Sequence, residues 1–264
     1  MITAKKSLGQ NFLVNQGIVQ KIIDAADIKK GDIILEIGPG TGILTKELAH
    51  RTGNVIAIEK DRDLIEDLRN KFPDIQVLED DILKFDPAKY LAPNTKFKLM
   101  GNIPYYITSH LLRTIFESAN WRMARPELIV LMIQKEVAQR IMAKPPDMNI
   151  LALSVQFYSK PEIVAQVSRG SFRPEPNVDS AVIKLTPTET NLTKTEADNL
   201  FKVIRAGFSS KRKKLINNLS VFRSPDELKE ILSKISIPEK VRAENLSIDD
   251  WVKLQNELFT SPNS

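Results

Sequence analysis

The stretch IILEIGPGTG, residues 33–42, runs from a short apolar segment into three glycines and decides how the first part of the chain folds. Ile33–Ile37 predicts a buried strand, because β-branched residues in a short run bounded by Gly and Pro suit a sheet interior. Gly38, Gly40 and Gly42 let the chain turn sharply into a helix and let a ligand approach the backbone. The stretch is therefore typical of a nucleotide-cofactor loop that follows the first strand of an α/β domain.

Strand-like and helix-like segments alternate through the first two thirds of the chain. Predicted strands after Ile33–Ile37 are Val55–Glu59, Ile75–Leu78, Lys98–Gly101, Leu128–Ile133 and Ala181–Leu185. Predicted helices are Ile18–Ala26, Leu44–Arg51, Asp63–Phe72, Ser109–Phe116 and Lys135–Ala143. Apolar strands separated by amphipathic helices indicate a mostly parallel, Rossmann-like sheet covered on both faces.

The last third of the chain has a different pattern. A polar, turn-rich stretch at Pro187–Thr195 is followed only by helical periodicity, at Ala197–Phe208, Arg212–Leu219, Pro225–Ser233 and Ile248–Leu258. Ser224, Pro225 and Glu227 form a start signal with an N-cap, a proline at the first helical position and a capping box. We therefore predict an α/β cofactor-binding domain at residues 1–186 and a small helical domain at residues 187–264.

Polar residues follow three of the predicted strands. Glu59 ends the second strand, where a carboxylate can accept both hydroxyls of a ribose. Glu79, Asp80 and Asp81 follow the third, and one of these carboxylates can accept the amino group of an adenine while Ile82 packs on its ring. Because parallel sheets bind ligands at the carboxyl ends of their strands, these groups and the glycine loop are expected along one edge.

Asn102-Ile103-Pro104-Tyr105 after the fourth strand predicts a clamp for a planar exocyclic amine. The Asn102 side chain and a backbone carbonyl near Ile103 or Pro104 can each accept an N–H, and the Tyr105 ring can stack on the base. Such acceptors polarise the amine and stabilise the positive charge that develops as a methyl group arrives. Together with the glycine loop, the clamp indicates methyl transfer from S-adenosylmethionine to a base.

A proline-spaced loop, Ser171–Ser180, precedes the last strand. Pro174 and Pro176 stiffen it, so we expect Phe172 to stack opposite Tyr105 on an extruded base. The alternative is that Phe172 is a core residue at the junction of loop and strand.

The amino-acid composition argues against several kinds of active site. The 264 residues contain no cysteine and two histidines, which argues against a thiolate nucleophile or a zinc or other metal site. No apolar run approaches the roughly 18 residues of a membrane span, and no signal peptide is visible, so we expect a cytoplasmic monomer. The net charge is +5, with basic segments at Lys5, Lys6 and Lys21 before the first acid and at Lys202–Arg223, which indicates a polyanionic partner.

In their order along the chain, several motifs resemble the bacterial small-subunit ribosomal RNA adenine dimethyltransferases. They are Lys5–Leu13, Glu36–Gly42, Asn102–Tyr105, Phe172–Ser180 and Phe208–Leu219. The resemblance implies a class I methyltransferase sheet. It also implies N6,N6-dimethylation of two adjacent adenines in a hairpin loop near the 3′ end of the small-subunit RNA, late in ribosome assembly. The expected partner is ribosomal RNA in the pre-ribosomal small subunit.

The resemblance also implies residue roles. Cofactor contacts fall on Asn11, Leu13, Gly38, Gly40, Glu59, Asp81, Ile82 and Asn102; catalytic contacts fall on Asn102, Tyr105 and Phe172. RNA contacts are expected from Lys5, Lys6, Arg205, Lys211, Arg212, Lys213 and Lys214. Tyr106, Glu175, Asn177 and Lys213-Lys214 depart from the family pattern, and an acid at Glu175 would repel phosphate.

Three other functions are compatible with parts of the sequence. A large-subunit adenine dimethyltransferase shares single motifs, but the Leu8-Gly9-Gln10 lead-in disfavours it. A non-catalytic RNA-binding assembly factor would not need the intact clamp. A nicotinamide-dependent oxidoreductase is disfavoured because Ile43 stands where its fingerprint requires Gly or Ala.

Overall fold

The computed structural model describes residues 4–5, 8–118, 120–121 and 124–259, which form two compact units. The first unit contains residues 1–139 and 159–187, and the second contains residues 140–158 and 188–264. The domains predicted from the sequence, at residues 1–186 and 187–264, stay a prediction. In the structure one boundary between the units follows Pro187, and the segment 140–158 belongs to the helical unit rather than to the sheet unit.

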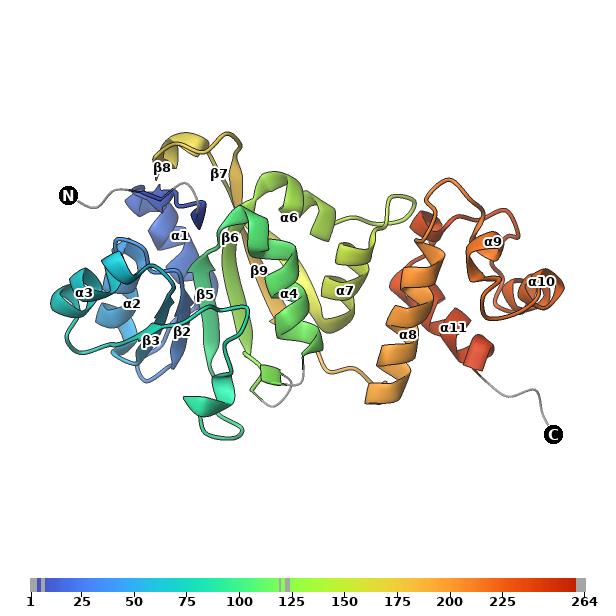
Figure 1. The fold of residues 1–264 in the computed structure, drawn as a ribbon, viewed down its shortest axis with the longest axis horizontal. Coiled ribbons are helices and arrows are strands. Elements are labelled where there is room, and N and C mark those ends of the chain that lie inside the picture. The colour runs from blue at the N-terminus through green and yellow to red at the C-terminus, as the bar shows by residue number, and fades with distance from the viewer. Residues whose placement is uncertain (1–3, 6–7, 119, 122–123, 260–264) are drawn as a thin grey trace. The chain divides into compact units, whose positions relative to one another are not determined.

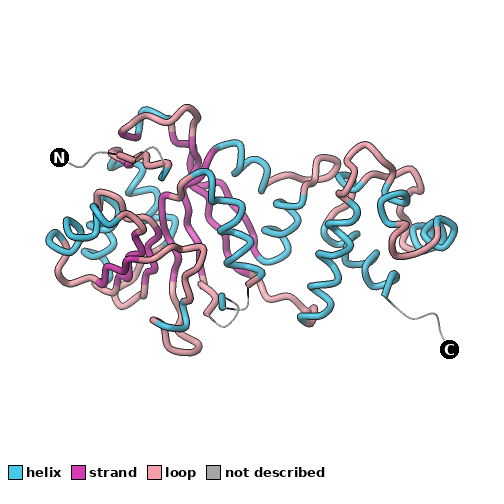
Figure 2. Tube along the Cα trace, in the orientation of Figure 1, coloured by secondary structure: helices cyan, strands magenta, loops and turns pink. Residues whose placement is uncertain are grey.

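A seven-stranded sheet organises the first unit (Figures 1 and 2). Its strands, in spatial order, are β4 (Gln76–Glu79), β3 (Val55–Glu59), β2 (Ile34–Ile37), β5 (Lys98–Asn102), β6 (Leu128–Gln134), β9 (Ser180–Pro187) and β7 (Ser159–Val167). The first five are parallel, whereas β9 is antiparallel to both β6 and β7. The predicted mixed α/β, Rossmann-like architecture is confirmed.

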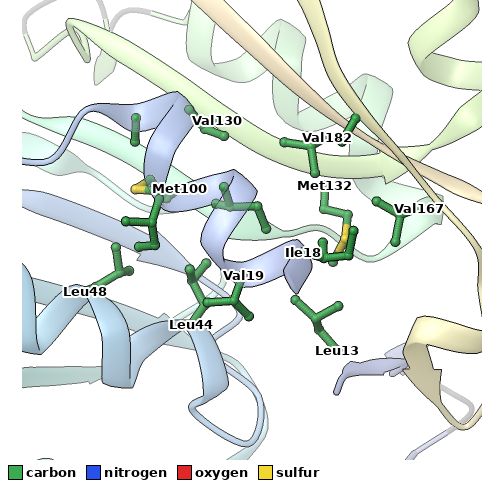
Figure 3. Close-up of a cluster of buried hydrophobic side chains, with 14 of the residues drawn as sticks. Leu13, Ile18, Val19, Leu44, Leu48, Met100, Val130, Met132, Val167 and Val182 are labelled. Atoms are coloured by element: carbon green, nitrogen blue, oxygen red, sulfur yellow. The ribbon is translucent and has the colours of Figure 1, made fainter. Parts of the chain in front are cut away.

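One face of the sheet packs against α1 (Gln16–Ala26) and α2 (Ile43–Thr52). Figure 3 shows the α1 residues Ile18 and Val19 among Met100, Val130 and Met132 of the neighbouring strands β5 and β6. Because side chains alternate along a strand, the intervening residues of these strands face the opposite side. In Figure 1, α4 (Thr108–Glu117) runs along the sheet on that side.

A smaller cluster holds α3 (Arg62–Lys71) against the other end of the sheet. Its Leu64, Ile65 and Leu68 pack on Ala57 of β3 and Val77 of β4. Asp61 caps the helix by accepting the Asp63 N–H at 3.1 Å. This cap matters for the site because Asp61 follows the end of β3 by two residues.

Three sheet elements have no counterpart in the sequence prediction. The edge strand β7 contains Pro161 and several exposed polar residues, so it lacks a continuous apolar run; an edge position tolerates both. The pair β1 (Phe12–Leu13) and β8 (Phe172–Arg173) has two residues in each strand, too few for a periodic signal.

The second unit is helical, as predicted. It contains α7 (Ile150–Tyr158), α8 (Lys194–Gly207), α9 (Leu215–Leu219), α10 (Pro225–Lys234) and α11 (Ile248–Phe259), while α6 (Lys135–Ile141) runs from the first unit into it. The capping box of Ser224 and Glu227 is present in α10, and Thr193 and Glu196 form a second one in α8. Trp251 of α11 is fully buried beside Gly207.

Gly101 tests how closely β2 and β5 approach. A Cβ at this position would lie 2.4 Å from the Ile37 carbonyl oxygen, which is backbone and cannot turn away. We expect Gly101→Ala to lower the free energy of unfolding by about 1–3 kcal/mol or more, the usual cost of overpacking. Gly170→Ala is the matched control, because nothing lies within 4 Å of a Cβ there. Equal urea midpoints for the two variants would contradict the close approach.

Candidate active site

A cavity of about 150 Å³ lies at the carboxyl edge of the parallel strands. Its lining includes Gly38, Gly40, Glu59, Asp81 and Asn102, which come from the loops or ends of four strands. The sequence prediction that these groups meet along one edge is therefore correct. Asn11 and Ile82 also line the cavity.

The glycine loop needs its glycines for both conformation and space. Gly40 has φ +59, and a Cβ there would approach the Phe12 ring to 3.0 Å. Gly42 caps α2 with φ +86, and a Cβ there would meet the Phe72 ring at 2.5 Å. The loop backbone is consequently bare toward the cavity, and a ligand can approach it closely.

Glu59 is held in one orientation by backbone donors. Its Oε1 accepts the N–H groups of Lys60 and Asp61, each at 2.8 Å, and its Oε2 accepts the Gly40 N–H at 3.3 Å. The side chain is only 7% exposed, and burial raises the pKa of its carboxyl. A fixed carboxylate at the cavity wall has the chemistry to accept hydroxyl groups of a ribose.

Asp81 lies on the neighbouring loop and carries a partner. Its Oδ2 pairs with Lys60 Nζ at 2.8 Å, and its Oδ1 accepts the Leu83 N–H at 3.1 Å. Burial by itself would raise the pKa of Asp81, but these hydrogen bonds hold it below its usual value. Of the three consecutive acids at the end of β4, Asp80 and Asp81 line the cavity, whereas Glu79, the last residue of the strand, does not.

The clamp residues have defined hydrogen-bond directions. Asn102 Nδ2 donates to the Asn11 carbonyl oxygen at 2.9 Å, so the Oδ1 end of the amide is the acceptor. The Pro104 carbonyl already accepts the Ile107 N–H at 3.1 Å, and the second acceptor predicted from the sequence is a carbonyl near Ile103 or Pro104. Tyr105 lines the same cavity, and its hydroxyl bonds to Ser180 Oγ at 2.6 Å.

Ion pairs and a hydrogen bond hold the N-terminal segment beside the cavity. Lys5 Nζ contacts Asp61 at 2.5 Å and Asp63 at 2.6 Å, while Gln10 Nε2 donates to Asp61 at 2.6 Å. The Lys5 ammonium thus pairs with two carboxylates in this structure, and its predicted contact with RNA stays a prediction. Lys6, the other basic residue predicted there, lies outside the described residues.

Phe172 and Leu13 are core residues. Phe172 is fully buried and Leu13 is 4% exposed, and both belong to the cluster around α1. The predicted sandwich of Tyr105 and Phe172 is therefore wrong for this conformation, because Phe172 has no exposed face and does not line the cavity. Strand alternation explains the arrangement: Leu13 pairs with Phe172 across β1 and β8.

Two aromatic residues that sequence reasoning did not assign line the cavity instead. Phe12 lies over the glycine loop, and Tyr106 is 64% exposed at the cavity. Phe12 could have been found from its neighbours, because Asn11 and Leu13 were both predicted to lie near the cofactor. Tyr106 was noted only as a departure from the family pattern.

The basic segment of the second unit lies in a turn. Helix α9 begins at Leu215 and not at Arg212, and residues 211–214 are all exposed. In the part of the chain that the structure describes, none of these four side chains forms an ion pair or hydrogen bond. Buried Asn218 fixes the turn by donating to the carbonyls of Gly207 and Ser210, at 2.5 and 3.0 Å.

Glu36 is the most deeply buried acid of the site. It is 1% exposed and lies beside Gly38 and Asn102 in a small cavity of about 30 Å³ behind the glycine loop. Among the described residues, its Oε2 atom has no hydrogen-bond partner. Burial, with the nearby Glu59 charge, raises the pKa of Glu36 to about 8, so the group is mostly protonated at neutral pH.

These features define an S-adenosylmethionine-dependent methyltransferase with a separate helical unit. A family profile described as "Ribosomal RNA adenine dimethylase" matches residues 1–259, and the chain belongs to that family.

Relatives named ribosomal RNA small subunit methyltransferase A include one from Dehalococcoides mccartyi, which is 42% identical over 99% of this chain and 90% of its own length. The one from Clostridioides difficile is 40% identical over 98% of this chain and 92% of its own.

Two solved structures resemble the whole chain. A dimethyladenosine transferase from Plasmodium falciparum has a TM-score of 0.77 and 31% identity, and covers 92% of this chain and 95% of its own. The 23S rRNA methyltransferase ErmE has a TM-score of 0.75 and 26% identity, and the match covers 95% of this chain and 100% of the ErmE chain. The oxidoreductase alternative is thereby excluded.

The burial of Phe172 has a measurable consequence. We expect Phe172→Ala to lower the free energy of unfolding by about 3–5 kcal/mol, because it leaves a cavity in the core. Tyr106→Ala removes an exposed ring and should change it by less than about 0.5 kcal/mol. Urea unfolding gives both values. A small loss of stability at Phe172, with methyl transfer reduced more than about tenfold, would restore the stacking role.

The raised pKa of Glu36 predicts a pH dependence of stability. Because the folded state binds this proton up to about pH 8 and the unfolded state releases it near 4.5, stability falls as pH rises between these values. We expect Glu36→Gln to lack this part of the fall, so that its stability relative to the parent increases from pH 5 to pH 8. Denaturant titrations across that range measure the difference. A constant difference would show that Glu36 titrates as an ordinary acid.

Proposed function

We propose that this chain dimethylates, at N6, two adjacent adenines in a hairpin loop near the 3′ end of the small-subunit ribosomal RNA, late in ribosome assembly. The observation that carries the proposal is the clamp. The Asn102 amide is oriented by the Asn11 carbonyl so that its oxygen can accept from an amine. The names of the relatives that share about 40% of the sequence over nearly the full length support the small-subunit target.

The residues of the cavity fit S-adenosylmethionine. Glu59 would hold the ribose hydroxyls, Asp81 the adenine amino group with Ile82 against the ring, and the bare backbone of Gly38 and Gly40 the methionine end. The Glu36 carboxyl behind the loop, mostly protonated at neutral pH, offers a polar group to a bound ligand. When bound, the cofactor supplies an electrophilic methyl group on a sulfonium.

The clamp would activate a poor nucleophile. The lone pair of an adenine amino group is delocalised into the ring. Methyl transfer therefore requires that this electron density shift back toward the nitrogen. Asn102 Oδ1 and the Ile103 carbonyl would each accept one N–H and stabilise the positive charge that develops on the nitrogen. A neutral amide suffices because the proton can leave after transfer.

Tyr105 would provide the stacking face for the target base. Its hydroxyl is fixed by Ser180, so the ring has little freedom to lose when a base binds. Stacking on one aromatic ring contributes roughly 1–3 kcal/mol per base. The target adenine must be unpaired or extruded, because a duplex hides its amino group.

The second unit would bind the RNA backbone. Lys211, Arg212, Lys213 and Lys214 are exposed in a turn that buried Asn218 fixes, and Arg205 is exposed on α8. Unpaired cations on a fixed turn suit phosphate groups. We place the activity in the cytoplasm, on a monomeric protein that meets the immature small subunit.

A large-subunit target is the second candidate, because ErmE shares the fold over the whole chain. Its identity to this chain is 26%, against 42% for the small-subunit relative from Dehalococcoides mccartyi, so the small-subunit target is preferred. A non-catalytic assembly factor is disfavoured by the intact and oriented clamp.

The proposal is tested with immature small subunits that lack these methyl groups. Radiolabelled transfer, with mass spectrometry of the RNA, should show dimethyladenine at adjacent positions. Large-subunit precursors should remain unlabelled. We expect Asn102→Ala to reduce transfer by about a hundredfold or more, because it removes a preorganised acceptor. Asn54→Ala, an exposed amide at the opposite edge of the sheet, should retain the parental rate. An Asn102→Ala rate within about threefold of the parent would refute the clamp.

The basic turn predicts a salt dependence. Replacing residues 211–214 by alanine should weaken RNA binding and flatten the slope of log affinity against log salt, with cofactor affinity unchanged. The matched control removes the same charge from the first unit, at the exposed Lys30, Lys46, Lys89 and Lys96. If both sets change the slope equally, net charge and not the turn governs binding.

A further inference from the structure

A second cavity, of about 380 Å³, opens at the carboxyl end of β6, on the same edge of the sheet as the clamp. Its walls come from Gln134 at the end of β6, the first residues of α6 and the loop that leads into β9. In Figure 1 this region lies where β6 meets α6. None of its lining residues lines the cofactor cavity.

Tyr105 and Ser180 connect the two cavities. Tyr105 lines the cofactor cavity, and its hydroxyl bonds to Ser180 Oγ. Ser180 pairs with Gln134 across β9 and β6, and the preceding Asp179 lines the second cavity. Two strand spacings of about 4.8 Å separate β5 from β9, so the cavities lie on the order of 10 Å apart.

The frame of the second cavity is fixed by its own contacts. Asp179 Oδ1 accepts the Arg169 N–H at 3.1 Å, and the Asp179 carbonyl accepts the Lys135 N–H at 3.0 Å. Arg169 pairs with Glu175 at 2.8 Å, which also neutralises the acid that would otherwise repel phosphate. The cavity is therefore preformed in this structure.

The side chains that face the cavity are uncommitted. In the described ranges, the side chains of Gln134, Lys135, Glu136, Gln139 and Asn177 make no hydrogen bond or ion pair. Three amides offer both donors and acceptors, Lys135 offers a positive charge, and Glu136 offers carboxylate oxygens that can accept the amino group of a base. Val178, which is 43% exposed, adds an apolar surface. One nucleotide has a base edge that the amides can hydrogen-bond, a ring that can contact Val178 and a phosphate that can pair with the lysine. The side chains of this cavity therefore match one nucleotide.

We propose that this cavity holds the nucleotide next to the target adenine while the target occupies the clamp. The inference rests on the proposed function, in which two adjacent adenines are modified in turn. The amides contact the edge of the neighbouring base, and Lys135 contacts the phosphate that joins the two nucleotides. The Tyr105–Ser180 pair separates the two bases. A neighbour held in this way keeps the loop open and positions the RNA for the second adenine.

The test uses the full chain saturated with S-adenosylhomocysteine, and compares adenylyl-3′,5′-adenosine with adenosine monophosphate by calorimetry. We expect the dinucleotide to bind about tenfold tighter, the scale of one hydrogen bond to a charged group. The double variant Lys135→Ala with Gln139→Ala should lose this gain and bind the mononucleotide like the parent. Lys30→Ala, which removes a charge at the opposite edge, should keep the gain.

Each outcome separates the inference from the function. If the parent binds the dinucleotide no tighter than the mononucleotide, the cavity is not a nucleotide site, even where immature subunits are methylated. A gain that persists in the double variant also overturns the assignment, because the added contact then lies elsewhere. A gain that the double variant loses, without methylation of small subunits, supports the cavity and removes the ribosomal target. Unfolding curves of both variants confirm that they remain folded.

Discussion

The close approach of β2 and β5 is the constraint on which the site depends. Gly101 leaves no room for a side chain against the Ile37 carbonyl, and a Cβ at Gly38 would lie 3.5 Å from the Asn102 carbonyl. The end of β2 begins the glycine loop and the end of β5 carries the clamp. Bringing these backbones together therefore places the glycine loop beside Asn102, and parallel pairing aligns both at one edge.

The two units differ in the charged groups that they present. The first unit surrounds its cavity with carboxylates, of which Asp61 and Asp81 are neutralised by lysines while Glu36 and Glu59 are buried. Asn102, which lies at the same cavity, carries no charge. The second unit presents unpaired cations on a turn, which suits a polyanion.

Hydrogen bonds and an ion pair hold the clamp and its neighbours in place. Asn11 orients the Asn102 amide, Ser180 holds the Tyr105 hydroxyl, and Lys5 with Gln10 fastens the N-terminal segment to Asp61. Preorganised acceptors cost little reorganisation when charge develops, which is where such sites gain most of their catalytic effect. The core position of Phe172 contributes to the same rigidity, because it anchors the loop that ends at Ser180.

The sequence by itself determined the parallel sheet, the glycine loop, the helical second unit and the gathering of Glu59, Asp81 and Asn102 at one edge. These follow from local patterns: apolar runs, glycine spacing and the rule that strand ends in a parallel sheet meet. Only the tertiary structure decided which way side chains face and which charges are paired. Phe172 is buried and Phe12 lines the cavity because β1 pairs with β8, and Lys5 is neutralised because Asp61, far along the chain, lies beside it. Long-range packing likewise settled the edge strand β7 and the position of α7 in the helical unit. Neither segment carries a periodic signal of its own.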